Sequence, residues 1–233
     1  MNINILQGID GAKNARGIAV IIDVFRAFSF ECYSVHNNAA HIIPVADKDL
    51  AYSLKRIHPE YLLAGERHGR MLEGFDFGNS PSQIEKIDLT GKTLIHTTSA
   101  GTQGLENAVN AEEVITGSLV NARAIAAYIC ARKQPVVSLV CMGTNAERPA
   151  EEDDLCAAYI ESLLRDRPFD MQEKIEALRM GGGSKFFDSS LGEVFPERDF
   201  ALCTCVDRFD FVLRSVKKDG LLRIEPIPIV LYS

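Results

Sequence analysis

Acidic and basic side chains stand together where apolar segments of this chain end. Asp23 and Arg26 come at the end of one apolar run, and Glu66 and Arg67 come directly after another. In α/β proteins such positions lie at the carboxyl ends of strands, where ligands bind. Carboxylates there can hold a cation, and arginine binds oxyanions in bidentate fashion. We therefore predict an active site for an anionic ligand, with a strand-terminal ion pair or helix cap as the alternative for Asp23 and Arg26.

A long irregular loop follows the second of these acid–base pairs. Residues 65–81 contain five glycines or prolines, together with Phe, Leu and Met residues that a flexible linker would lack. Loops of this length inside a compact domain are usually functional or disordered. We interpret it as an active-site loop in which Asp76, Asn79 and Ser80 bind substrate. Turn formation is the competing explanation for Asp76 and Asn79, and Ser80 also fits a helix cap.

Hydroxyl side chains crowd the start of a predicted helix near Thr102. Hydroxyls and unpaired main-chain N–H groups at a helix N-terminus bind phosphate, because the donors and the helix dipole both favour an anion. Ordinary capping explains one of these hydroxyls but not four in six residues. Ser118 and Asn121 repeat the arrangement one unit later, where capping is the favoured interpretation. The expected phosphate-binding residues of the first loop are Thr97, Thr98, Ser99, Gly101 and Thr102.

Four consecutive carboxylates follow Arg148 and begin another predicted helix. The helix dipole explains most of them, since negative charge is favourable in a first turn. We expect one of Asp153 and Glu152 to be a metal ligand as well. Asp23 and Glu66 would join it, because all three positions follow strands at one edge of a parallel sheet. Carboxylate oxygens suit a hard cation such as Mg²⁺.

The composition of the 233 residues excludes several classes of protein. A net charge of −7 disfavours nucleic-acid binding, which needs surplus Lys and Arg. The six cysteines form no Cys-x-x-Cys pair, so neither a zinc site nor a disulfide framework is expected. Apolar runs fall short of the roughly 20 residues of a membrane helix and the N-terminus lacks a signal-peptide pattern, so we expect a cytoplasmic protein without a membrane partner. The thiolate and Asp-x-Asp phosphatase motifs and the common nucleotide-binding glycine motifs are also absent.

Apolar runs that alternate with helical patterns predict an α/β fold. The predicted strands are residues 18–24, 41–45, 61–64, 93–95, 113–115 and 136–141, and the predicted helices are residues 29–37, 47–56, 102–109 and 121–132. The last third adds helices at 151–164, 171–180 and near 198–207, then a hairpin of 211–215 and 221–224. We predict a three-layer α/β/α architecture with a largely parallel or mixed sheet and a helical C-terminal elaboration. Residues 1–233 would form one domain, or two intimately packed subdomains divided near residues 145–180.

Taken in order, six motifs resemble those of the 2-phosphosulfolactate phosphatases. They are residues 23–29, 65–67, 74–81, 97–102, 117–121 and 148–156, within a match that runs from about residue 17 to residue 165. The resemblance implies a Mg²⁺-dependent phosphatase with an α/β fold peculiar to that family. It also implies hydrolysis of 2-phosphosulfolactate to sulfolactate and phosphate, a step of coenzyme M biosynthesis.

Four residues depart from the family pattern. Phe28 and Phe30 stand where small Thr or Ser residues are usual, Ala100 replaces an Asn, and His68 replaces a Gly. We expect these four residues to line the pocket, and therefore to affect the choice of substrate more than the type of reaction.

The resulting hypothesis assigns a role to each charged residue. The predicted metal ligands, directly or through water, are Asp23, Glu66 and Asp153, and the predicted anion-binding arginines are Arg26, Arg67 and Arg148. Three arginines exceed what one phosphate requires, which favours a substrate with a second acidic group. Cys156 is predicted to be structural. A non-catalytic anion-binding module and a nucleotide-binding regulator remain the alternatives, and the attacking group and homo-oligomer formation stay open.

Overall fold

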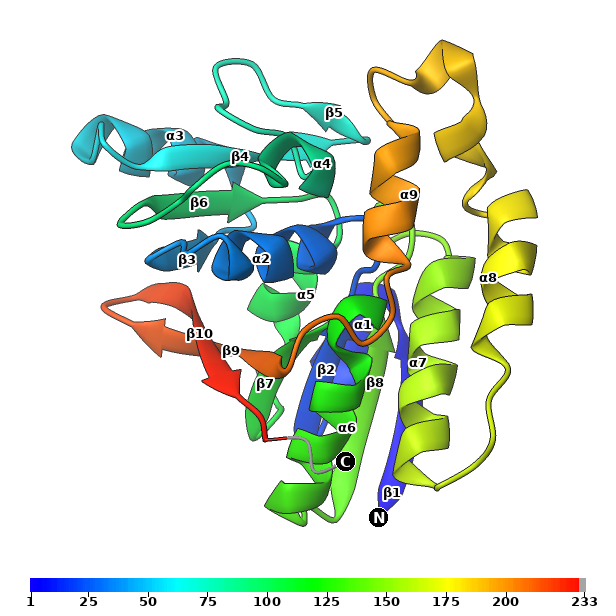
Figure 1. The fold of residues 1–233 in the computed structure, drawn as a ribbon. Helices are drawn as coiled ribbons and strands as arrows, with labels where there is room; N and C mark the ends of the chain where they lie inside the picture. The colour runs from blue at the N-terminus through cyan, green and yellow to red at the C-terminus, as the bar shows by residue number, and fades with distance from the viewer. Residues whose placement is uncertain (231–233) are drawn as a thin grey trace.

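A mixed sheet of ten strands forms the centre of residues 1–230, the part of the chain that the computed structural model describes (Figure 1). The strands are β1 (Asn2–Gln7), β2 (Ile18–Ile22), β3 (His41–Pro44), β4 (Leu62–Arg67), β5 (Arg70–Met71), β6 (Thr93–Thr97), β7 (Glu113–Gly117), β8 (Val136–Cys141), β9 (Phe211–Lys218) and β10 (Leu221–Pro228). The α-helices are α1 (Gly8–Asn14), α2 (Ala27–His36), α3 (Lys48–Ile57), α4 (Pro81–Ile84), α5 (Gly101–Asn107), α6 (Ala122–Arg132), α7 (Glu151–Leu164), α8 (Met171–Met180) and α9 (Glu197–Cys203). Three short 3₁₀ helices are η1 (Leu119–Asn121), η2 (Ser184–Phe187) and η3 (Ser189–Leu191). The predicted α/β class is confirmed.

Two parallel blocks of strands are joined by an antiparallel hairpin. In the first block β1, β8, β2 and β7 are parallel neighbours, and in the second block β3, β6 and β4 are. The hairpin of β9 and β10 lies between the blocks and pairs antiparallel with β7 and with β3. Its ladder with β3 is a single residue pair, Ile224 with Ile42. The sequence predicted the hairpin but not its central place in the sheet.

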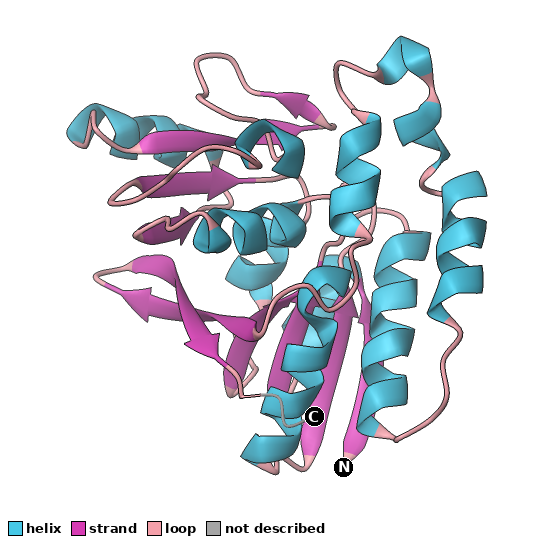
Figure 2. Cartoon of the chain, viewed as in Figure 1, coloured by secondary structure: helices cyan, strands magenta, loops and turns pink. Residues whose placement is uncertain are grey.

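Helices cover both faces of the sheet, as the continuous apolar runs require (Figure 2). All five residues of β2 are buried. Ile18, Val20 and Ile22 belong to a core with α6 and α7, whereas Ala19 and Ile21 belong to a second core with α1 and α5. β2 is therefore a central strand between two helical layers.

The C-terminal elaboration brings late residues to the carboxyl ends of early strands. Helix α8 packs beside α7, and α9 contacts α4 and η2 (Figure 1). The guanidinium of Arg26, just after β2, thereby reaches the carboxylate of Asp199 in α9 at 2.8 Å. None of the helices in residues 1–230 has the length and apolar character needed to cross a membrane.

Candidate active site

The ends of four strands meet at one cleft of about 200 Å³. Asp23 follows β2, Glu66 lies at the end of β4, Ser99 follows β6 and Gly143 follows β8, and all four line the cleft. The two blocks of strands run in opposite directions along the sheet. However, the second block lies crosswise to the first, so that its strands point toward the end of the first block (Figure 1). The predicted meeting of these strand ends arises from this bend, not from one continuous parallel edge.

Asp23 is the central carboxylate of the cleft. Its side chain is buried, and its Oδ1 accepts a hydrogen bond from the main-chain N–H of Ala27 at 3.3 Å. Gly101 lies against the other oxygen, since a Cβ at that position would stand 2.9 Å from Oδ2. Burial raises the pKa of Asp23 to about 7, with the negative charge of Glu66 adding to the shift and the Ala27 N–H opposing it. Asp23 is therefore unfavourable as an anion unless a cation is close.

Glu66 is held with both carboxylate oxygens engaged. The main-chain N–H of Ser99 donates to Oε1 at 2.7 Å, and the main-chain N–H of Gly69 donates to Oε2 at 2.6 Å. The Ser99 hydroxyl also donates to Oε2, at 3.1 Å. This clamp joins the segments that follow β4 and β6 and fixes the carboxylate in the wall of the cleft.

Asp153 and Glu152, the two alternatives from the acidic run, both line the cleft. The main-chain N–H of Val24 donates to Asp153 Oδ1 at 2.9 Å, and that of Gly143 donates to Oδ2 at 2.8 Å. Burial raises the pKa of Asp153 well above its usual range, and the charges of Asp23 and Glu152 add to the shift. Burial also raises the pKa of Glu152, with Lys185 opposing the change.

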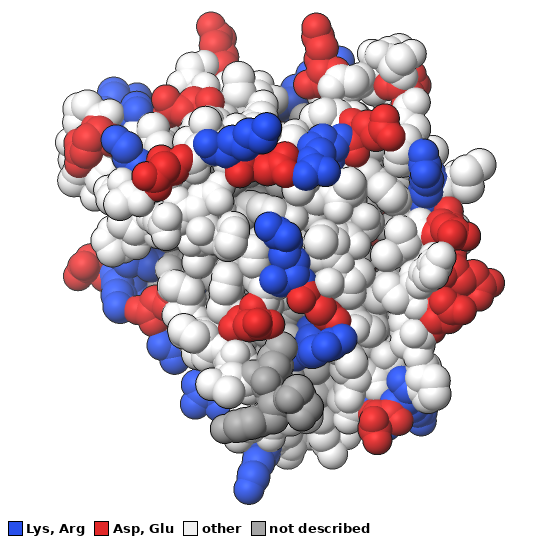
Figure 3. Space-filling view, in the orientation of Figure 1, with Lys and Arg blue, Asp and Glu red and all other residues white. Residues whose placement is uncertain are grey.

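These carboxylates have the donor chemistry of a site for a hard cation. Burial and the negative charges of neighbouring carboxylates raise the pKa values of Asp23 and Asp153, and a divalent ion would relieve both effects. Within residues 1–230, no three His, Cys, Asp or Glu side chains are arranged to ligate a single ion. Mg²⁺ commonly binds one or two carboxylates and keeps several waters, so the cleft fits an ion held partly through water. On the face of the molecule that Figure 3 shows, Lys and Arg side chains are interspersed with Asp and Glu side chains.

Arg26 lines the cleft, but a buried carboxylate already neutralises its guanidinium. Nη1 donates to Asp199 Oδ2 and to the carbonyl of Val194, each at 2.8 Å, and Nη2 donates to the carbonyl of Gly69 at 3.2 Å. The Ser80 hydroxyl and the Ser82 N–H occupy the remaining positions on Asp199. Arg26 therefore ties the C-terminal elaboration to β4 and β2.

Arg67 and Arg148 lie outside the cleft, contrary to expectation. Nη2 of Arg67 donates to Thr97 Oγ1 at 2.9 Å and to a main-chain carbonyl of the segment after β3 at 3.0 Å. Arg148 is exposed and lines a separate hollow beside α1. A tight turn, in which the Thr144 N–H donates to the Arg148 carbonyl at 2.8 Å, directs the chain there. The structure therefore gathers one of the three predicted arginines at the carboxylates.

The hydroxyls predicted to bind phosphate mostly bond within the protein. The Thr98 N–H donates to Thr102 Oγ1 at 3.0 Å, and the Thr102 N–H donates to Thr98 Oγ1 at 3.2 Å. Thr97 Oγ1 accepts from Arg67. Ser99 is the hydroxyl of this loop that reaches the cleft, beside Ala100.

Three other candidates lie outside the cleft in structural positions. Ser118 and Asn121 form a capping box, and the Ser118 hydroxyl lies 2.7 Å from that of Ser29. The capping interpretation of the sequence describes them. Asp76 is exposed, where its Oδ2 accepts the Leu63 N–H at 2.8 Å. Its turn-forming alternative fits this position.

Asn79 lies in the cleft as predicted and has no partner there. Its side chain is 6% exposed, and its Oδ1 makes no hydrogen bond to any atom of residues 1–230. A buried polar atom without a partner is unfavourable, so this oxygen is available to accept a hydrogen bond from a ligand or a bound water. Ser80 next to it is committed to Asp199.

The cleft contains residues that the sequence did not indicate, and it lacks two residues that we expected to line it. Lys185 and Phe195 come from the C-terminal elaboration and line the cleft. Of the four residues that depart from the family pattern, His68 and Ala100 line the cleft. Phe28 and Phe30 are instead fully buried in the core. The expectation that all four departures line the pocket was therefore wrong for the phenylalanines, because α2 turns them toward the sheet.

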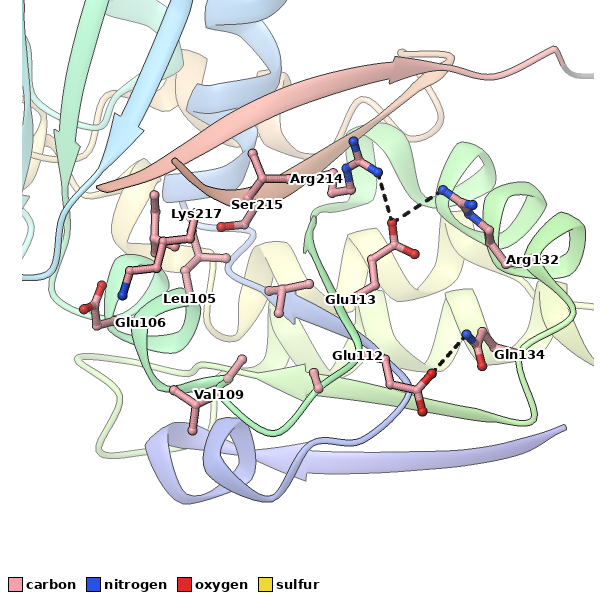
Figure 4. A pocket seen from close by; sticks show the side chains of 15 residues that line it. Leu105, Glu106, Val109, Glu112, Glu113, Arg132, Gln134, Arg214, Ser215 and Lys217 are labelled. Atoms are coloured by element: carbon pink, nitrogen blue, oxygen red, sulfur yellow. Dashed lines mark hydrogen bonds and ion pairs between the residues drawn. The ribbon is translucent and has the colours of Figure 1, made fainter. Parts of the chain in front are cut away.

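A larger hollow of residues 1–230 lies elsewhere, near the start of β7 (Figure 4). Its volume is about 690 Å³. Its charges are paired across the wall, as Arg214 and Arg132 both approach Glu113, at 3.8 and 3.6 Å. The carboxylates that line this hollow, Glu106, Glu112 and Glu113, are exposed or half-buried, so we place the chemistry in the smaller cleft with its buried carboxylates.

Comparison with known proteins shows the family of this chain. The profile of the family described as 2-phosphosulpholactate phosphatase matches residues 4–218. The chain belongs to this family. A relative from Bacillus subtilis, named probable 2-phosphosulfolactate phosphatase, is 32% identical over 94% of this chain and 96% of its own length. A relative of the same name from Caldanaerobacter subterraneus is 33% identical over 88% of this chain and 89% of its own.

A third relative of that name, from Caldicellulosiruptor saccharolyticus, is 42% identical over 150 residues, which span 63% of this chain and 62% of the relative. The 2-phosphosulfolactate phosphatase family membership that the motifs predicted is thus confirmed. The matched segment of the family profile contains the whole carboxylate cluster and Lys185.

Proposed function

We propose that this protein is a Mg²⁺-dependent phosphatase that hydrolyses 2-phosphosulfolactate to sulfolactate and phosphate. The observation that carries the proposal is the buried cluster of Asp23, Glu66 and Asp153 in one cleft, in a chain of the 2-phosphosulfolactate phosphatase family. Burial and the charges of neighbouring carboxylates raise the pKa values of Asp23 and Asp153, as expected of a site built around a cation.

The carboxylates of the cleft would hold the metal and orient the phosphoryl group. Asp23 would bind the ion, with Glu66 and Asp153 as further ligands directly or through water. Mg²⁺ supplies Lewis-acid stabilisation of the charge on the phosphoryl oxygens. The main-chain donors on Glu66 and Asp153 keep their oxygens in place without side-chain rearrangement.

The remaining cleft residues would complete the binding of the phosphoryl group. The Ser99 hydroxyl donates to Glu66 and would help to hold that carboxylate at the phosphoryl group, and the unpartnered Oδ1 of Asn79 would accept a hydrogen bond from a bound water. In the net reaction the bond from phosphorus to the lactate oxygen breaks, a proton goes to that oxygen, and water provides the new oxygen of the phosphate.

A panel of phosphorylated acids tests this proposal. The purified protein is incubated with 2-phosphosulfolactate, 2-phospholactate, ATP and glycerol 2-phosphate, and both phosphate and the organic product are quantified. We expect equimolar sulfolactate and phosphate from the first compound and the highest kcat/KM for it. Binding of these compounds without phosphate release would instead favour a non-catalytic module, and a preference for ATP would favour a nucleotide-binding protein.

A further inference from the structure

We propose that Lys185 binds the second acidic group of the substrate, the carboxylate or sulfonate that accompanies the phosphate, and so sets the preference for acidic phosphate esters. This inference rests on the proposed function and assigns to Lys185 a task that we predicted for three arginines. Lys185 lies in η2 and lines the cleft together with Asp23 and Glu66.

Among the cations that line the cleft, Lys185 has unused hydrogen-bond donors. Arg26 donates to Asp199 at 2.8 Å and is 3% exposed, so its charge is already compensated. The Nζ atom of Lys185 lies 3.8 Å from Glu152 Oε1, which is beyond hydrogen-bond distance, and its side chain is 29% exposed. No residue between 1 and 230 accepts a hydrogen bond from this Nζ atom. An anion entering the cleft can therefore take all three N–H groups.

Three aromatic rings surround the ammonium group. Nζ lies 5.6 Å from the ring centroid of Phe25, 5.6 Å from that of Phe186 and 5.5 Å from that of Phe195. Cation–π contacts at this distance orient an ammonium group without using its hydrogen bonds. Phe25 and Phe195 also line the cleft, and their apolar surface strengthens the attraction between Lys185 and an anion.

Packing of the C-terminal elaboration sets the position of Lys185. The neighbouring Phe186 is 2% exposed and packs with Phe200. Gly183 approaches Phe200 so closely that a Cβ there would stand 2.5 Å from the ring. The Gly182 N–H donates to Glu151 Oε2 at 2.7 Å, which fixes the segment to the start of α7. The glycine run thus seats η2 beside the acidic cluster.

The chemistry of lysine suggests what it recognises. A phosphoryl group belongs with the metal and the carboxylates, and a substrate with no other charge would leave the N–H groups of Lys185 without an acceptor, with Glu152 at 3.8 Å as its counter-ion. An ammonium is a compact point charge, so it accepts a planar carboxylate or a tetrahedral sulfonate, whereas the fork of arginine favours particular geometries. We therefore expect Lys185 to select substrates with a negative charge next to the phosphate, and to accept either a carboxylate or a sulfonate as that charge.

The test compares Lys185→Met and Lys185→Arg with a matched control, Lys174→Met. Methionine keeps an apolar side chain over the rings and removes the charge. Lys174 also stacks on a phenylalanine of the elaboration, 5.6 Å from Phe169, but does not line the cleft. We measure kcat/KM for 2-phosphosulfolactate, 2-phospholactate and glycerol 2-phosphate, and the Kd of sulfolactate by calorimetry.

Lys185→Met should weaken sulfolactate binding by about 10- to 100-fold, as expected for loss of a hydrogen-bonded ion pair. It should lower kcat/KM for both acidic esters at least tenfold more than for glycerol 2-phosphate, while Lys185→Arg recovers most of the preference and Lys174→Met resembles the unmodified protein. Equal losses on acidic and neutral esters, or an unchanged Kd for sulfolactate, would overturn the inference. Because the calorimetry needs no turnover, a protein that binds sulfolactate through Lys185 but releases no phosphate would refute the proposed function alone.

Discussion

The main-chain N–H of Val24 donates to Oδ1 of Asp153 at 2.9 Å, although the two residues are 129 positions apart. The other oxygen of Asp153 accepts the Gly143 N–H at 2.8 Å. One carboxylate therefore joins the segments after β2 and β8 to the start of α7. This arrangement places Asp153 near Asp23, whose negative charge adds to the raised pKa of Asp153.

The carboxylates of the cleft should be required for turnover. Asp23→Asn and Glu66→Gln keep the size of the side chain and remove its charge, so each should lower kcat/KM for the proposed substrate at least about 100-fold. Asp154→Asn is the matched control, because Asp154 is next to Asp153 but accepts a hydrogen bond from Gln7 at 2.7 Å outside the cleft. The control should keep activity within about twofold. Near-normal turnover in either cleft variant would remove that residue from the site.

The same substitution at Asp23 should stabilise the metal-free protein. The pKa of Asp23 is about 7 in the folded protein and near 3.8 when unfolded, because burial and Glu66 disfavour the anion. The folded state then binds more protons than the unfolded state between these values, so stability falls as pH rises from about 4 to 7. At pH 8 in EDTA, Asp23→Asn should raise the free energy of unfolding by up to about 4 kcal/mol, and near pH 4 the difference should vanish.

Urea denaturation at both pH values, with Asp154→Asn beside it, measures this effect. An Asp23→Asn protein that is no more stable than the unmodified protein at pH 8 would mean that another group already neutralises Asp23.

Metal affinity should depend on pH in the same range. A cation must displace the proton that Asp23 carries below its pKa of about 7. The affinity for Mg²⁺ should therefore fall about tenfold per pH unit between pH 7 and pH 5.5 and change little above pH 8. Calorimetric titration of Mg²⁺ across this range gives the slope, and a constant affinity would show that Asp23 is not a ligand.

Arg26 should be required for stability, whereas Arg148 should be dispensable for both stability and activity. Arg26→Ala leaves the fully buried Asp199 without its cation, so it should lower the free energy of unfolding by about 3–5 kcal/mol. Arg148→Ala removes an exposed side chain and should change stability by less than about 0.5 kcal/mol and kcat/KM by less than about threefold. Denaturation and steady-state kinetics on both variants check this, and a large loss of activity in Arg148→Ala would return that arginine to the site.

Cys156 should be a packing residue. It is fully buried, and burial with the nearby charge of Asp153 raises the pKa of its thiol well above the usual value. A thiol in this state is a poor nucleophile. Cys156→Ala should keep more than about half of the activity, measured as phosphate release, and a trapped phosphocysteine in the unmodified protein would contradict this.

The sequence predicted the strands that end at the cleft because buried strands carry continuous apolar runs, as residues 18–24 and 136–141 do. It missed β1, whose half-exposed edge position gives only a weak alternation of Asn and Ile. Asp23 and Asp153 could be predicted from their places in the chain. Asp23 directly follows β2, and Asp153 lies in the first turn of α7.

Arg148 and Lys185 could not be predicted from local patterns. The turn between Thr144 and Arg148 directs the arginine away from Asp153, although Asp153 lies only five positions later in the chain. The spacing of residues in the sequence does not indicate this turn. Lys185 reaches the cleft because Phe186 packs against Phe200, a contact that exists only in the folded chain.

Phosphate release from 2-phosphosulfolactate, measured with Mg²⁺ and with EDTA, tests the central claim most directly. We expect one phosphate per substrate in the presence of Mg²⁺, loss of this release in EDTA with recovery on adding Mg²⁺ back, and no comparable release by Asp23→Asn under any of these conditions. Absence of release with Mg²⁺, or release that persists in EDTA and in Asp23→Asn, would contradict the account.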